Sequence, residues 1–200
     1  VSMPAKPHNF HLDMATSVVP AGKMEVYAKA GKTLPSGWLI DANGVESHDP
    51  NEFLRIRAAK SYGGIFPVGG KGELNGGHKG YGLSLLVEIM CGSLSGGTTS
   101  NYVRLKPEVD KVCHCFLAID YGMSGDRQEI ENHLTSYLNE LRNAALADGE
   151  TRIYTHGDKA YAHMEHVKEN GVKMNDKTYN EIVNICRELD IDPSLYLIEK

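Results

Sequence analysis

The sequence predicts a mixed α/β fold, in which helices cover a mixed sheet and are concentrated in the second half of the chain. Side chains alternate over residues 112–120 with the period of a strand. Residues 79–94 carry apolar side chains almost all round a helix, which indicates a buried central helix. Three amphipathic helices are expected near the end, over residues 126–146, over residues 159–170 and from Asn175 onward.

The first half of the chain combines an extended segment, a helix and turns. Residues 8–12 are expected to be extended, and residues 16–30 to form a helix that ends at Gly31. The side chains that could cap the start of this helix are Asp13, Thr16 and Ser17. Asn43-Gly44 then predicts a tight turn in the loop that follows.

Composition and charge exclude several classes of function. The chain has 21 basic and 26 acidic residues, a net charge of −5, and no basic run of the kind that binds nucleic acid or an anionic membrane. Its longest apolar stretch, residues 83–91, is interrupted by Glu88 and is far shorter than the ~20 residues of a membrane span. The four cysteines form no CxxC pair, which favours a reducing, cytoplasmic compartment.

The beginning of the sequence is unusual. It reads Val1-Ser2-Met3-Pro4, with no initiator methionine, and its first residues are typical of the end of a strand. We therefore expect either a fragment of a longer protein or an unusual start.

The strongest local motif is a glycine-rich segment, because nine of the twenty residues 63–82 are glycine. It leads directly into the helix expected from Lys79. A helix start presents free backbone N–H groups and the positive end of the helix dipole, which suit a phosphate. The segment matches neither the P-loop pattern nor GxGxxG. Two interpretations stay open: an anion site with Lys79 as its cation, or a loop shaped for packing with Lys79 in solvent.

A second candidate is the stretch Asp13-Met14-Ala15-Thr16-Ser17, which joins an extended segment to a helix start. Its backbone and the Asp13 carboxylate could bind a ligand. The alternative is that the same polar side chains only cap the helix.

The sequence predicts no metal site. His163 and His166 lie one helical turn apart, but no third ligand follows at metal-site spacing and no HExxH occurs. Cys113 and Cys115 would share one face of the expected strand, where packing is the simpler role. No GxSxG or other activated serine is present.

Several motifs occur in a characteristic order and spacing: Leu12-Asp13-Met14-Ala15-Thr16-Ser17-Val18-Val19, Gly22-Lys23-Met24-Glu25-Val26, Pro35-Ser36-Gly37-Trp38 and Gly77-His78-Lys79-Gly80-Tyr81-Gly82-Leu83. Over essentially its whole length the chain resembles the type-2 malate/L-lactate dehydrogenases. That group also includes ureidoglycolate dehydrogenases, a diketogulonate reductase and reductases of cyclic imino acids.

The resemblance implies a homodimeric oxidoreductase that uses NAD or NADP and a small 2-hydroxy or 2-oxo acid, on a nucleotide-binding fold that is not Rossmann. Residues 1–120 would form the nucleotide-binding region, and residues 121–200 a helical part that packs onto the same sheet. The family's cofactor contacts carry over to Leu12, Asp13, Met14, Ala15, Thr16, Ser17, Val18, His78 and Lys79. A third contact, a Pro-Gly-Glu-like turn in the family, reads His156-Gly157-Asp158 here, and this departure weakens the correspondence.

The resemblance assigns no catalytic residue to this chain. In the family the catalytic histidine and a substrate-binding arginine belong to an N-terminal region that has no counterpart in this sequence. We therefore expect the 200 residues by themselves to turn over slowly or not at all. The alternatives to an enzyme are a truncated nucleotide-binding or interaction module without turnover, and an unrelated soluble α/β domain.

Overall fold

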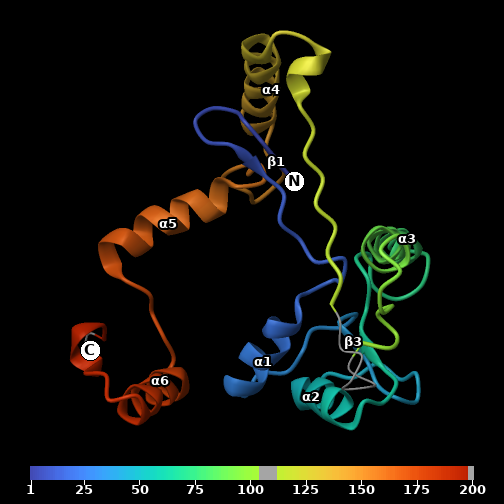
Figure 1. The fold of residues 1–200 in the computed structure, drawn as a ribbon, viewed down its shortest axis with the longest axis vertical. Helices are drawn as coiled ribbons and strands as arrows, with labels where there is room; N and C mark the ends of the chain where they lie inside the picture. The colour runs from blue at the N-terminus through green and yellow to red at the C-terminus, as the bar shows by residue number, and fades with distance from the viewer. Residues whose placement is uncertain (104–111, 198–200) are drawn as a thin grey trace. The chain divides into compact units, whose positions relative to one another are not determined.

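The computed structural model describes residues 1–103 and 112–197. The chain divides into two compact units, one made of Met14–Asp120 and the other of Val1–Asp13 with Tyr121–Lys200. We call the first the glycine-loop unit and the second the three-helix unit; Figure 1 shows their elements. The expected division into residues 1–120 and 121–200 differs from this one in the place of residues 1–13.

The described residues of the glycine-loop unit form three α-helices and one small sheet. Its elements are α1 (Ala21–Lys29), β3 (Leu39–Ile40), α2 (Pro50–Ala59), β4 (Gly64–Ile65), α3 (Gly77–Glu88) and the π-helical turn η1 (Ile89–Ser93). Strands β3 and β4 pair antiparallel. The buried core between these elements consists of Met24, Leu34, Leu39 and Phe53. The core is therefore built from α1, α2 and the strand between them.

Local sequence signals explain the start of α2 and the end of α1. Asp49 caps α2 by accepting a hydrogen bond of 2.9 Å from the Asn51 backbone N–H, and Pro50 stands in the first turn. Gly31 follows α1 with φ of +63°, as the predicted C-terminal glycine should. The predicted turn at Asn43-Gly44 also forms, with φ of +78° at the glycine.

The helix predicted over residues 16–30 begins five residues later, at Ala21. Residues 16–18 are extended because they pair with residues 66–68: Val18 N–H donates to the Phe66 carbonyl and Val68 N–H to the Thr16 carbonyl. The residue before α1 is Pro20, and no side chain caps the helix. The interpretation of Asp13, Thr16 and Ser17 as helix caps is therefore wrong.

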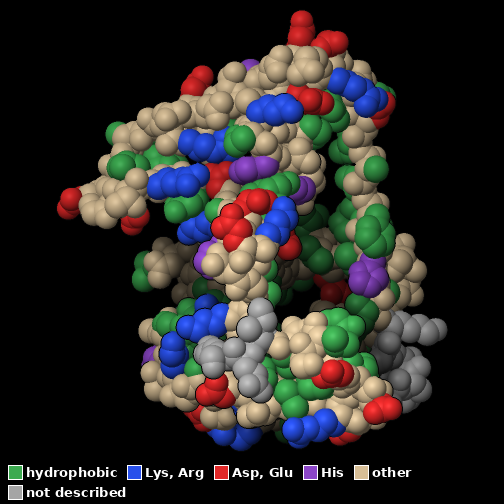
Figure 2. Space-filling model, turned by 90° about the vertical axis from the view of Figure 1, so that its left-hand side faces the viewer, with side chains coloured by type: hydrophobic (Ala, Val, Ile, Leu, Met, Phe, Trp, Pro, Cys, Tyr) green, Lys and Arg blue, Asp and Glu red, His purple; other side chains and the backbone are tan. Residues whose placement is uncertain are grey.

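Helix α3 was expected to be buried, and this expectation is also wrong. Its buried residues are Gly77 and Gly80, so the helix packs through its glycine face. The apolar side chains on its other faces are about half exposed; they include Leu83, Leu86 and Val87. Hydrophobic side chains also reach the surface among charged ones on the face drawn in Figure 2. The predicted helix over residues 79–94 is divided into α3 and η1.

Residues 112–120 form no strand, contrary to the alternation of their side chains. Phe116, Leu117 and Ile119 are all more than 70% exposed, so neither face of the segment is buried. A strand needs a backbone partner as well as a pattern, and no other described residue pairs with this segment. Cys113 is half-buried and Cys115 exposed, so the two cysteines do not pack together on one face.

The three-helix unit confirms the helices predicted near the end of the chain. Its elements are β1 (Ser2–Met3), β2 (Phe10–His11), η3 (Tyr121–Ser124), α4 (Arg127–Arg142), α5 (Asp158–Asn170), α6 (Asp176–Glu188) and η4 (Pro193–Leu195). Helices α4 and α6 are capped by Asp126 and Asn175, and α5 ends at Gly171 as expected. Helix α4 stops four residues before the predicted end. The extended segment over residues 8–12 contains β2.

The α/β class is confirmed, but the described residues hold two separate two-stranded sheets and not one mixed sheet. Strands β1 and β2 pair antiparallel in the three-helix unit. Strands β3 and β4 belong to the other unit. The packing of residues 121–200 onto the nucleotide-binding region stays a prediction.

Two glycines of α3 provide a matched test of this packing. A Cβ on Gly80 would clash with the Val68 backbone, whereas a Cβ on Gly82 would meet no heavy atom within 4 Å. We expect Gly80→Ala to lower the free energy of unfolding by about 1–3 kcal/mol, the usual cost of overpacking. Gly82→Ala should raise it by about 0.5–1 kcal/mol, because alanine favours a helix. Urea unfolding of both variants measures the difference, and equal effects would contradict the close packing at Gly80.

Candidate cofactor site

The glycine-rich segment forms a hollow of about 400 Å³ at the start of α3, which His78 and Lys79 line. Gly76 has φ of +82° and begins the helix. A Cβ on Gly69 or Gly77 would overlap backbone atoms on the facing part of the segment. Packing therefore explains why glycine stands at these positions. It does not explain why Lys79 lines the hollow. None of the described carboxylates forms an ion pair with Lys79.

The stretch Met14-Ala15-Thr16-Ser17 lies in the same unit and lines a second hollow of about 540 Å³, together with Tyr81 and Ser84 of α3. The pairing of residues 16–18 with residues 66–68 fixes this arrangement, because residues 66–68 belong to the glycine-rich segment and lie just before Gly69. The Ser17 hydroxyl donates to the Val19 carbonyl at 2.8 Å. The glycine-loop unit thus brings Met14, Ala15, Thr16 and Ser17 close to α3, the helix that carries His78 and Lys79.

The three-helix unit holds three more of the predicted contacts in one open groove of about 650 Å³. Asp13, His156 and Gly157 line it, although Asp13 is far from the other two in the sequence. The His11 backbone N–H donates to the His156 carbonyl at 3.2 Å, which joins β2 to the turn before α5. The Leu12 backbone N–H donates to the Val1 carbonyl, and the Val1 amino group donates to the Leu12 carbonyl, each at 2.8 Å.

Glycine is required at the centre of this turn. Gly157 has φ of +108°, where side chains are strained, and a Cβ there would lie 3.1 Å from the Asn9 carbonyl oxygen. The turn therefore approaches the N-terminal segment closely. This approach brings Leu12-Asp13 and His156-Gly157 together.

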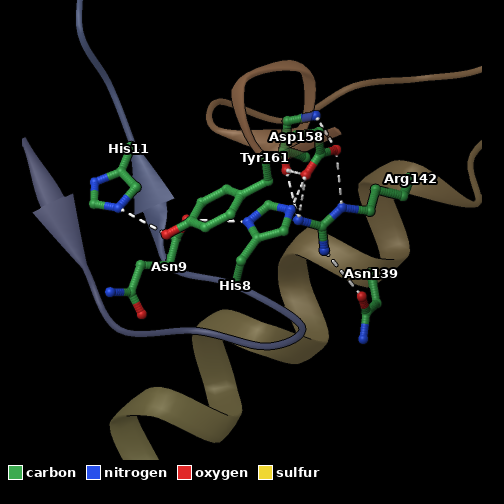
Figure 3. Close-up of polar contacts among 8 residues, drawn as sticks. His8, Asn9, His11, Asn139, Arg142, Asp158 and Tyr161 are labelled. Carbon is green, nitrogen blue, oxygen red and sulfur yellow. Dashed lines mark hydrogen bonds and ion pairs between the residues drawn. The ribbon is translucent and has the colours of Figure 1, made fainter. Parts of the chain in front are cut away.

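A buried network around Asp158 fixes the same two segments (Figure 3). The Asp158 side chain is 1% exposed and forms an ion pair of 3.0 Å with Arg142 at the end of α4. Its Oδ2 accepts a hydrogen bond of 2.8 Å from the Thr155 backbone N–H. Nε2 of His8 lies 2.9 Å from the Asp158 Oδ1. The carboxylate thus connects α4, the turn before α5 and the N-terminal segment.

Burial acts to raise the pKa of Asp158, but hydrogen bonds from Arg142 and from the Thr155 backbone N–H lower the pKa by more. The net result is a pKa of about 2, against an ordinary value of 3.8. Asp158 is therefore a carboxylate at neutral pH. Because both of its oxygens already have protein partners, its structural role is clear, and its predicted role toward a cofactor stays a prediction.

Aromatic contacts extend the network toward the groove. The His8 ring stacks on the Tyr161 ring with 4.3 Å between centroids, and the Tyr161 hydroxyl lies 3.1 Å from Nε2 of His11. His11 in turn lines the groove. Tyr161 of α5 therefore holds the ring of His11 through this contact (Figure 3).

Sequence reasoning missed Arg142, Thr155, Tyr161 and His8. A signal existed for one of them, since Tyr161 lies one helical turn after the glycine turn on a predicted helix. Arg142 was visible as a basic residue near the end of an amphipathic helix, where it is usually solvated. Its partner depends on the distance between α4 and α5, which local patterns do not encode.

The described residues contain no group of three or more His, Cys, Asp or Glu side chains that could hold a metal ion. The rings of His163 and His166 stack at 6.4 Å on α5. Among the residues that the structure describes, no helix combines the length and apolar character needed to cross a membrane.

The lowered pKa of Asp158 predicts how stability depends on pH. Its folded pKa lies below the unfolded value, so the contribution is present above about pH 4 and is lost as pH falls toward 2. A shift of this size is worth about 2 kcal/mol. Asp158→Asn should remove this part of the pH dependence and cost about 3 kcal/mol at pH 7, since it leaves Arg142 without its partner.

Urea unfolding at pH 7, 4 and 2.5 measures both effects. Asp148→Asn, at an exposed loop position of the same unit, is the matched control and should behave like the parent protein. Parallel pH profiles for the parent and Asp158→Asn would contradict the assignment.

Comparison with known proteins places the chain. A family model described as malate/L-lactate dehydrogenase matches residues 1–183. A malate dehydrogenase of Pyrococcus abyssi is 38% identical over 192 residues, which cover 96% of this chain and 51% of that protein. An L-sulfolactate dehydrogenase of Methanothermobacter thermautotrophicus is 28% identical over 195 residues, with coverage of 96% and 51%.

The fold agrees with these matches. The crystal structure of malate dehydrogenase from Entamoeba histolytica superposes with a TM-score of 0.87 at 31% identity, over 96% of this chain and 54% of that one. The chain thus spans about half the length of the curated relatives it matches. The resemblance inferred from its motifs is confirmed: this chain belongs to the malate/L-lactate dehydrogenase family.

Proposed function

We propose that the chain binds NAD or NADP as part of an oxidoreductase that acts on a small 2-hydroxy or 2-oxo acid. The observation that carries this proposal is the groove of the three-helix unit. It gathers Asp13, His156 and Gly157, residues that the motifs had marked as cofactor contacts. Packing at Gly157 brings the two segments together, and a role in cofactor binding explains why predicted contacts from both segments line the same groove.

In each unit, taken by itself, the size and charge of the hollows suit a part of a nucleotide. Each of the three hollows lined by predicted contacts measures about 400–650 Å³, within the range of ligand pockets in general. Asp13 offers a carboxylate to ligand hydroxyls, and Lys79 a cation to a phosphate. Within each unit a helix without a side-chain cap, α3 in one and α5 in the other, adds free backbone N–H groups and the positive end of its dipole, which attract an anion.

The nicotinamide, when bound, supplies the hydride chemistry. The residues of this chain bind and orient the cofactor. The hydroxyl proton and the substrate carboxylate require an acid–base group and a cation, and we assign neither role to a residue of this chain. The relatives named malate, sulfolactate and pyrroline-carboxylate enzymes favour a small acid or cyclic imino acid as substrate. We also propose a homodimer, as the family resemblance implies, and a cytoplasmic location, which the absence of a CxxC pair favours.

The alternative is a nucleotide-binding or interaction module without turnover. Nicotinamide fluorescence assays with malate, lactate and ureidoglycolate on the intact protein distinguish the two. Oxidation of any of these acids supports the enzyme. Cofactor binding without turnover of any acid tested favours the module.

Lys79 tests the site in the glycine-loop unit. Lys79→Ala should weaken binding of the nicotinamide nucleotide roughly tenfold or more, the effect of losing a charge-assisted hydrogen bond. Lys32→Ala removes an equal charge from an exposed position of the same unit and should leave affinity unchanged. Fluorescence titration measures both dissociation constants. Normal affinity of a folded Lys79→Ala protein would remove Lys79 from the site.

Asp13 tests the groove of the three-helix unit. Asp13→Asn keeps the shape of the side chain and removes its charge, so nucleotide affinity should fall while the melting temperature stays near that of the parent. The structure favours this outcome over a stability loss, because Asp13 caps no helix. A lower melting temperature with normal affinity would show that Asp13 is structural.

A further inference from the structure

His11 lines the groove of the three-helix unit and is held there through both its backbone and its side chain. Its backbone N–H donates to the His156 carbonyl at 3.2 Å, and it pairs with Ser2 between β2 and β1. Nε2 of its ring lies 3.1 Å from the Tyr161 hydroxyl, and the two rings stack with 5.8 Å between centroids. The protein itself therefore fixes the orientation of the His11 ring.

Tyr161 is in turn fixed by the buried network around Asp158. Its ring stacks on the His8 ring with 4.3 Å between centroids and an angle of 16° between the planes. Nε2 of His8 lies 2.9 Å from the Asp158 carboxylate, whose side chain is 1% exposed. Figure 3 shows this line of contacts from Asp158 through His8 and Tyr161 to His11. The ring of a groove residue is thus connected to the interior of the unit.

The second ring nitrogen of His11, Nδ1, points away from Tyr161 (Figure 3). No residue that the structure describes forms a hydrogen bond with Nδ1, and His11 is only half-buried. An imidazole that is bound at one nitrogen presents the other as a donor or as an acceptor, according to its tautomer. A ligand hydroxyl can both donate and accept, so it suits Nδ1 in either tautomer, whereas a phosphate suits only the donor form.

The neighbouring residues support the direction of the His11 side chain. His11 and Asp13 line the groove, and Leu12 between them does not. Side chains two positions apart in an extended chain point to the same side. The hydrogen bonds between Leu12 and Val1 hold this segment beside the start of the chain. His11 therefore faces the same cavity as Asp13.

We propose that His11 binds a hydroxyl of the nicotinamide nucleotide through Nδ1, and that Tyr161 is the positioning residue that holds the His11 ring for this contact. The inference rests on the proposed function and adds two residues that the motifs did not mark. A ring that is already oriented loses little further freedom when the ligand binds, so its contact contributes more to affinity. Tyr161 does not itself line the groove, so it acts through His11.

The competing interpretation is that the contact between Tyr161 and His11 only joins β2 to α5. In that case loss of the tyrosine hydroxyl lowers stability and leaves nucleotide affinity unchanged. A positioning role has a different signature. Loss of the hydroxyl then lowers affinity, and it has no further effect once the ligand-binding nitrogen of His11 has been removed.

The test is fluorescence titration of the intact protein with NADH and with NADPH. Tyr161→Phe keeps the stacking on His8 and removes the hydroxyl, so affinity should fall roughly threefold. His11→Gln keeps a polar atom near the position of Nε2 and has none at Nδ1. It should weaken binding about three- to tenfold, the range for one neutral hydrogen bond. The double variant should bind as weakly as His11→Gln alone.

Tyr137→Phe removes a hydroxyl from an exposed position of α4 in the same unit and is the matched control. A melting temperature for each variant shows whether it is folded, and Tyr161→Phe decides alone if His11→Gln unfolds. Lower affinity in both single variants, no added loss in the double variant and normal affinity in the control support the assignment. Normal affinity of either folded single variant, or losses that add in the double variant, overturn it and leave the proposed function standing. A parent protein that binds neither nucleotide overturns both.

Discussion

The buried ion pair between Asp158 and Arg142 is the interaction on which the three-helix unit depends. A carboxylate that is 1% exposed would be strongly destabilising without a partner, and Arg142 provides one at 3.0 Å. The Asp158 carboxylate also accepts a hydrogen bond from the Thr155 backbone N–H and contacts the His8 ring. Because these partners come from α4, from the turn before α5 and from the N-terminal segment, one carboxylate sets the distances among three parts of the chain. The groove is a consequence of those distances.

In the glycine-loop unit the equivalent constraint is steric. Gly77 and Gly80 allow α3 to approach the backbone of residues 68–72 more closely than any side chain would permit. This contact brings the start of α3 near the extended residues 16–18, which pair with the strand-like segment before residue 68. Packing and ligand binding are thus compatible explanations of the same glycines. The close approach forms the hollow, and Lys79 at the helix start gives it a charge.

Local sequence signals predicted what local interactions determine. The helix limits at Asn175, Gly171 and Asp126 depend on caps within a few residues, and they were found. A strand over residues 112–120 would need a partner strand elsewhere in the chain. Burial of α3 would need another layer to cover its apolar faces. Neither can be obtained from periodicity. The motif order identified the family, but the Asp158 network could not be predicted, because its members meet only through tertiary packing.

The charged residues in and next to the groove differ in burial, and this difference separates their roles. Asp158 and Arg142 neutralise each other inside the protein, so they fix the turn and contribute little field to the groove. Asp13 and Lys159 line the groove, are exposed and form no ion pair among the described residues, so their charges remain available to a ligand. Asp158 therefore has a structural role, while the next residue, Lys159, lines the groove. This arrangement agrees with the cofactor role proposed for the groove.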